Sequence, residues 1–120
     1  MMPPKPQNEF VAFVIEQMSF VHGLRVRAMF SGHGVYQDDC MFAIIVDEQL
    51  FFKADANVRT EFEAKDLKPY TYVTRGKLVA MQYFEAPPEV FDEIDEMRIW
   101  VNKALTVARR ARKNKGLPFK

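Results

Sequence analysis

The chain has 120 residues, of which 48% are hydrophobic and 28% charged, as is typical of one folded domain and unlike a disordered chain. A single cysteine excludes an internal disulfide, and no apolar run approaches the roughly 18 residues of a membrane helix. The N-terminus also lacks the apolar run of a signal peptide, so we expect a cytoplasmic protein without membrane contact.

The net charge of +1 conceals an asymmetry along the chain. Residues 1–96 hold nine Lys or Arg and all sixteen acids, which gives −7. Residues 97–120 hold eight Lys or Arg and no acid, which gives +8. The basic end is therefore a candidate for contact with an anionic partner.

The first segment is predicted to be a flexible lead-in followed by a helix. Residues 1–7 contain three prolines. Asn8 is a suitable N-cap, and apolar side chains then recur at helical spacing as far as Val21. Gly23 suits the left-handed conformation that ends a helix, so we predict a helix over residues 8–22.

Residues 24–30 alternate in polarity, which predicts a half-buried strand. Val26 and Phe30 point to one side of this strand, and Arg25 and Arg27 point to the other.

Two further strands are expected to complete an antiparallel meander. The segment 34–47 holds a turn or bulge at Asp38–Asp39, followed by the run MFAIIV. This run is apolar on both faces, as is typical of a central strand that is covered on each side. Residues 49–54 are predicted to be its hairpin partner. Because the second face also needs cover, we expect it to lie in a homodimer interface or beneath the last helix.

A short helix and a second hairpin are predicted in the middle of the chain. The helix spans residues 55–64 and has Asp55 as its cap. The hairpin spans residues 70–85, with its turn at Arg75-Gly76-Lys77.

The last helical region is predicted to begin at Pro87-Pro88. Its apolar stripe runs from Val90 to Ala108, with a break near residues 92–95. The order α-β-β-β-α-β-β-α predicts an α+β fold, a two-layer α/β sandwich with a five-stranded, mainly antiparallel sheet. We assign residues 8–112 to a single domain and residues 113–120 to a basic tail.

The stretch RAMFSGHGVYQDDCMFAIIVDEQLFFKAD resembles the N-terminal domain of the TfoX (Sxy) competence-regulator family. The matching residues are Arg27, Met29, Phe30, Gly32, Gly34, Tyr36, Met41, Phe42, Ala43, Leu50, Lys53, Ala54 and Asp55. Residues 69–90 are similar to the family's second hairpin, and residues 100–112 to its closing helix. Ser31 stands where the family usually has a first glycine.

The resemblance covers about residues 9–112 and implies a two-layer α/β fold. It also implies a link to the transcriptional activation of DNA-uptake genes alongside the cyclic-AMP receptor protein. Competence regulators carry a second, C-terminal domain, for which this chain has no room, so we expect a stand-alone N-terminal domain. We therefore expect a non-enzymatic regulatory interaction module whose partner is a protein of the transcription machinery or a regulator.

Two groups of basic residues are candidates for contact with a partner, although both would also suit simple solvation. The sheet group consists of Arg25, Arg27 and Lys53. The group at the end of the last helix consists of Arg109, Arg110, Arg112 and Lys113. An alternative function is direct binding of nucleic acid through the second group.

Reactive residues gather between the first predicted strand and the central one. The glycines of SGHGVY are followed by a strand and not by a helix, which favours a bulge or bend over a phosphate cradle. A small enzyme or metal-binding protein using His33, Asp38 and Cys40 is a third hypothesis. These residues lack the paired spacing of zinc ligands, so we expect no catalytic residue, cofactor or metal.

Overall fold

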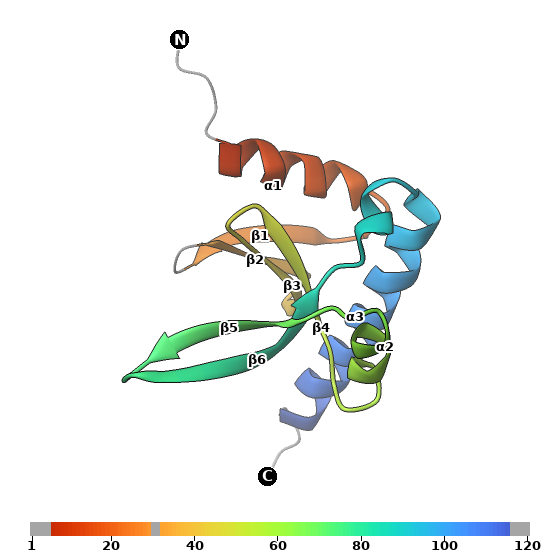
Figure 1. The fold of residues 1–120 in the computed structure, drawn as a ribbon. Helices are drawn as coiled ribbons and strands as arrows, with labels where there is room; N and C mark the ends of the chain where they lie inside the picture. The colour runs from red at the N-terminus through yellow and green to blue at the C-terminus, as the bar shows by residue number, and fades with distance from the viewer. Residues whose placement is uncertain (1–5, 30–31, 116–120) are drawn as a thin grey trace.

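The computed structural model describes residues 6–29 and 32–115 and places a six-stranded antiparallel sheet against three α-helices (Figure 1). The strand order is β1-β2-β3-β4-β6-β5. The elements are α1 (Pro6–Gln17), β1 (Leu24–Met29), β2 (Gly32–Gln37), β3 (Cys40–Val46), β4 (Gln49–Lys53), α2 (Arg59–Ala64), β5 (Pro69–Thr74), β6 (Lys77–Glu85), the 3-10 helix η1 (Pro88–Phe91) and α3 (Ile94–Lys115). The predicted α+β class is confirmed.

The sheet has one strand more than the five predicted, because Gly32–Gln37 forms a complete strand. This strand, β2, pairs with β1 along its whole length, from Met29 opposite Gly32 to Leu24 opposite Gln37. Its other edge pairs with β3. The predicted meander therefore contains four strands.

The predicted helices are present, but their ends differ from the prediction. The first begins at Pro6 and ends at Gln17, and turns then carry the chain to Gly23, whose φ of 76° is the expected left-handed conformation. The second is confined to Arg59–Ala64 because the chain first forms a turn at Asp55, whose Oδ1 accepts the backbone N–H groups of Asn57 and Val58.

The predicted break in the last helical region is confirmed, since η1 ends at Phe91 and α3 begins at Ile94. The helix α3 continues through residues 113–115, which had been assigned to the basic tail. The rest of that tail, residues 1–5 of the predicted lead-in, and Phe30 lie outside the described residues. No helix among those described is long and apolar enough to cross a bilayer.

The three helices contribute to one hydrophobic core on a single face of the sheet (Figure 1). Phe62 of α2 lies at the centre of an aromatic group. Its ring centroid is 5.3 Å from that of Phe84 on β6 and 4.9 Å from that of Trp100 on α3. Met18, which follows α1, and Phe42 of β3 are fully buried in the same core.

The strand β3 has apolar side chains on both faces, as predicted for residues 41–46. Phe42 and Ile45 belong to the helix-covered core, whereas Ile44 packs with Phe51 and Tyr83 in a second, smaller cluster. The second cluster lies on the face of the sheet opposite the core, because the adjacent residues Ile44 and Ile45 point to opposite faces of β3. Phe42 shares the core side with Ile45 because the register shift between Val35 and Tyr36 makes it an extra, unpaired residue of β3. The face that holds the second cluster carries the candidate site.

We predict that Phe62→Ala lowers the free energy of unfolding by about 3–5 kcal/mol, because Phe62 is 1% exposed and its loss leaves a cavity between three elements. Urea denaturation followed by circular dichroism measures the change. The control is Ile99→Ala on α3, which removes a side chain that is 47% exposed and should cost less than about 1 kcal/mol. Equal costs for the two variants would contradict the packing described.

Candidate functional site: the open face of the sheet

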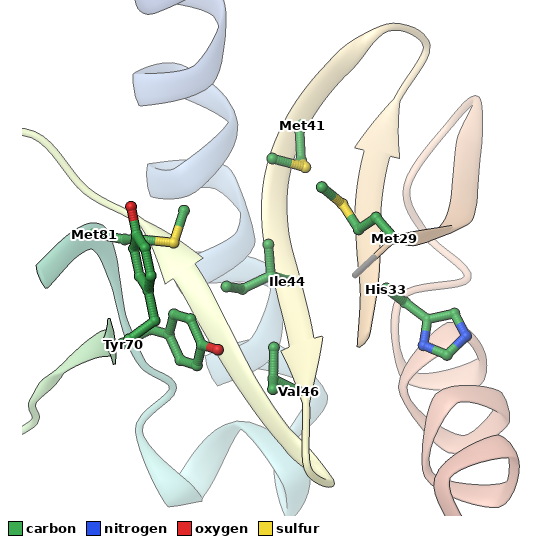
Figure 2. A pocket seen from close by; sticks show the side chains of 8 residues that line it. Met29, His33, Met41, Ile44, Val46, Tyr70 and Met81 are labelled. Atoms are coloured by element: carbon green, nitrogen blue, oxygen red, sulfur yellow. The ribbon is translucent and has the colours of Figure 1, made fainter. Parts of the chain in front are cut away.

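The face of the sheet opposite the helices contains an apolar groove with a volume of about 430 Å³ (Figure 2). Its lining residues come from five of the six strands and are Met29, His33, Met41, Ile44, Val46, Tyr70, Tyr72 and Met81. We call this surface the methionine–tyrosine groove.

The groove has a floor and two walls. Ile44 and Val46 of β3 form the floor. Figure 2 shows Met29 and Met41 on one side of these residues, and Tyr70 and Met81 on the other.

His33 lies at the edge of the groove, and its imidazole points away from the other labelled side chains (Figure 2). Apart from this histidine, the polar atoms of the lining side chains are the hydroxyls of Tyr70 and Tyr72. The site therefore offers apolar and aromatic contact and little hydrogen bonding.

Two glycines on β2 explain why side chains can pack closely on this face. A Cβ on Gly34 would lie 2.8 Å from the Sδ atoms of both Met29 and Met41. A Cβ on Gly32 would lie 2.2 Å from the backbone oxygen of Ile45 on β3. The glycines thus permit close approach inside a strand, and no bulge falls at them. The chain reverses direction just before Gly32, between Met29 and Gly32. The register shift falls just beyond, between Val35 and Tyr36.

Basic side chains lie on the same face as the methionine–tyrosine groove. The Arg27 Cζ is 5.9 Å from the ring centroid of Tyr36, and the Lys53 Nζ is 4.9 Å from that of Tyr83. Arg25 shares this face with Arg27, because the two residues are separated by Val26, which packs against the core. The sheet group of candidates therefore borders the open face at β1 and β4.

Tyr83 lies in the second cluster and is only 4% exposed. Burial, with a smaller contribution from the neighbouring Tyr36, raises the pKa of its phenol to about 12. The hydroxyl therefore stays protonated at neutral pH.

The basic residues at the end of α3 are mostly engaged with other parts of the fold. Arg109 donates a hydrogen bond to the side-chain oxygen of Gln37. Arg110 forms an ion pair with Asp55, at 2.9 Å between Nη1 and Oδ2. Lys113 is exposed.

Arg112 pairs with Asp39 in the turn between β2 and β3. Its side-chain hydrogen bond is the main cause that lowers the pKa of the Asp39 carboxyl, and the same contact raises the pKa of Arg112. The helix end is thereby attached to the sheet. A second hollow, of about 660 Å³, lies between this helix end and the strands, and it shares Met41 with the groove.

The third hypothesis required His33, Asp38 and Cys40 to lie together, and the register keeps two of them apart. His33 is opposite Ile45, whereas Cys40 is opposite Gln37, five residues further back along β3. Gln37 is four residues from His33 along β2, so at about 3.3 Å per residue the backbones of His33 and Cys40 are at least about 13 Å apart. Asp38 lies in the turn, where its N–H donates to the Gly23 carbonyl. Among the residues that the structure describes, no three His, Cys, Asp or Glu side chains form a group that could hold a metal.

Sequence reasoning missed the methionine–tyrosine groove. The alternation of strand residues shows that Tyr70, Tyr72 and Met81 share a face, but not whether a helix covers that face. The helix-free face becomes identifiable only from the three-dimensional packing.

The sequence model of the TfoX N-terminal domain family matches residues 16–108. A curated relative, the DNA transformation protein TfoX1 of Aliivibrio fischeri (strain ATCC 700601 / ES114), is 27% identical over 67 residues. These residues are 56% of this chain and 32% of that protein, so the match spans about a third of the relative's length. The family match includes all six strands and therefore the groove, and it ends just before Arg109.

We predict that Gly32→Ala and Gly34→Ala differ sharply in their effect on folding stability. The first should cost about 2–3 kcal/mol, because its Cβ meets a backbone oxygen that cannot move without disturbing the β2–β3 pairing. The second should cost less than about 1 kcal/mol, because the two methionine side chains can rotate away. Urea denaturation of both variants measures the difference, and a reversed order would contradict the proposed role of the glycines.

We predict that burial of Tyr83 makes the fold less stable in alkali. The folded pKa of about 12 lies above the ordinary value of 10.0, so the unfolded chain loses this proton first. The contribution is complete below pH 10 and is lost as the pH rises towards about 12. Tyr83→Phe should remove this part of the pH dependence and the last component of the tyrosinate absorbance titration. An unchanged titration in the variant would show that Tyr83 ionises with the other tyrosines.

Proposed function

This chain belongs to the TfoX N-terminal domain family, and we propose that it is a non-enzymatic interaction module that regulates DNA uptake by binding a protein partner. The name of its relative, a DNA transformation protein, supports the biological process. The proposed partner belongs to the transcription machinery or is a regulator of it. The methionine–tyrosine groove is the observation that carries the proposal.

The groove has the properties of a protein-contact surface. An apolar face that a domain of this size leaves without a covering layer is a common mark of an interaction site. Methionine side chains adapt to the shape of a partner, and tyrosines combine apolar contact area with a polar tip. Met29, Met81 and Tyr70 are all partly exposed in the groove, so a partner can reach them.

The charges beside the groove narrow the chemistry of the partner. Arg25 and Arg27 are exposed on the same face, with Lys53 at the other side of the second cluster. Cations at the rim of an apolar site favour acidic groups at the rim of the partner and speed the encounter. The proposed ligand is therefore a protein segment with apolar or aromatic anchors flanked by Asp or Glu.

The other two hypotheses have less support. A nucleic-acid phosphate at the end of α3 would compete with Asp39 and Asp55 for two of the arginines. The family match also ends at residue 108, so these arginines lie outside the segment that the chain shares with the family. The separation of His33 from Cys40 deprives the thiol hypothesis of its nearest sequence candidate for a base.

We predict that Arg27→Glu and Met81→Glu each weaken binding to the partner about tenfold or more, because they place a negative charge at the rim or in the apolar wall. The measurement is capture of cross-linked partners from the native cell extract, together with transformation frequency in cells that carry each variant. Both quantities should fall in parallel.

The matched control is Lys68→Glu, which makes the same charge change as Arg27→Glu at a side chain that is 70% exposed and outside the groove. It should leave capture and transformation unchanged. Normal transformation in cells that carry Arg27→Glu and in cells that carry Met81→Glu would contradict the proposal. Turnover of a substrate by the purified chain would also contradict it.

A further inference from the structure

The two edges of the sheet differ in how they are protected against pairing with another strand. The edge strand β1 carries Arg25 and Arg27, whereas the edge strand β5 has the sequence PYTYVT and no charge. Native sheets protect their edges with charged side chains, prolines and bulges. On β5 such protection is limited to Pro69 and the register shift between Pro69 and Thr71, both at the start of the strand.

A pair of highly exposed hydrophobic side chains also lies at the unprotected end of β5. Val73 is 69% exposed and its cross-strand neighbour Leu78 is 72% exposed, the largest values among the big hydrophobic residues described. Figure 1 shows that the β5–β6 hairpin extends away from the helices. Nothing in the described part of the chain covers these side chains.

The hairpin turn determines which backbone groups of β5 face outward. Arg75 and Gly76 have φ angles of 54° and 75°, which makes a two-residue type I′ turn closed by Thr74 and Lys77. Pairs in an antiparallel ladder alternate between hydrogen-bonded and non-bonded, so the N–H and C=O groups of Tyr72 and Thr74 face β6. Those of Thr71 and Val73 therefore point outward, without a strand neighbour among the described residues.

We propose that two copies of this chain pair antiparallel through β5 and form a closed twofold dimer. In the register that pairs the outward N–H and C=O groups, Thr71 lies opposite Val73 of the second copy, and Val73 lies opposite Thr71 of the second copy. Each of these two pairs forms two backbone hydrogen bonds, which gives four in total. Tyr72 then lies opposite Tyr72 of the second copy on the axis. This inference does not depend on the proposed function.

The sequence at both ends of the pairing segment agrees with this short register. Pro69, the next outward-facing residue, has no N–H to donate, and Arg75 already lies in the turn. The β1 edge cannot pair with itself in the same way without bringing Arg25 and Arg27 close to their own copies, which repel. The assembly therefore stops at two copies and does not grow into a fibre.

The dimer places exposed side chains of the two copies beside one another on both faces of the sheet. Tyr72 lines the methionine–tyrosine groove, so the grooves of the two copies meet at the twofold axis. On the opposite face, Val73 of each copy lies beside Thr71 of the second copy, whereas Leu78 lies on β6, one strand further from the axis. The second copy thus lengthens the groove and gives Val73 a cross-strand neighbour on its outer side.

The first test is the mass of the purified chain, measured by light scattering and sedimentation over a wide range of concentration. We expect twice the 14.0 kDa of one chain. Val73→Lys, which places a charge on the pairing edge, should raise the dissociation constant of the dimer about tenfold or more. The control Ile99→Lys makes the same kind of change at an exposed position on α3 and should remain a dimer.

The second test fixes the register with engineered cysteines in a Cys40→Ser background, where no native thiol remains. With oxidised glutathione present, Tyr72→Cys should form a disulfide-linked dimer, because the two copies of residue 72 face each other. Thr74→Cys should not, because the two copies of this residue are about 13 Å apart, beyond the reach of a disulfide.

A chain that stays monomeric at every concentration would overturn the proposal. A monomer that pairs β5 with a strand of another protein would overturn it as well. A dimer that is unaffected by Val73→Lys would also overturn it, because that dimer would use another surface. Cross-linking at position 74 and not at 72 would refute the register.

Discussion

The strand β3 has to bury apolar side chains on both of its faces, and the architecture follows from that requirement. Its helix side carries Phe42 and Ile45, which α1, α2 and α3 cover together with the neighbouring strands. Its other side carries Ile44, which none of the described helices covers and which is nevertheless buried. The cover on that side comes from the sheet itself, where Phe51 and Tyr83 close over Ile44 and leave the groove beside it.

The glycines of β2 make this one-sided cover possible. Gly32 lets β2 approach the backbone of β3, and Gly34 leaves room for two methionine sulfurs above it. A larger residue at position 34 would fill the wall of the groove. The Gly-His-Gly segment thus permits close packing against both neighbouring strands, β1 and β3. Its conformation is ordinary, since neither glycine has a positive φ.

Local sequence patterns were sufficient to predict the fold class, both hairpins and the break before Ile94, because each depends on neighbours in the chain. The sixth strand was missed because Gly32 and Gly34 weaken the β-strand signal, which pairing on both edges of β2 overrides. The groove was missed for a different reason. Alternation assigns residues to a face, but whether that face is covered depends on where helices distant in the sequence pack.

The distribution of charge is a second property whose arrangement in space the sequence does not show. The chain separates an acidic body from a basic end, and this separation suggested a cationic surface for nucleic acid. In the fold, however, Arg110 and Arg112 lie beside Asp55 and Asp39, so the asymmetry along the chain is partly neutralised in space. Ion pairs this exposed add little to stability, but they do set the direction of the side chains. Arg25 and Arg27 of β1 are instead exposed beside an apolar surface, which is why the proposed partner carries acids next to its apolar anchors.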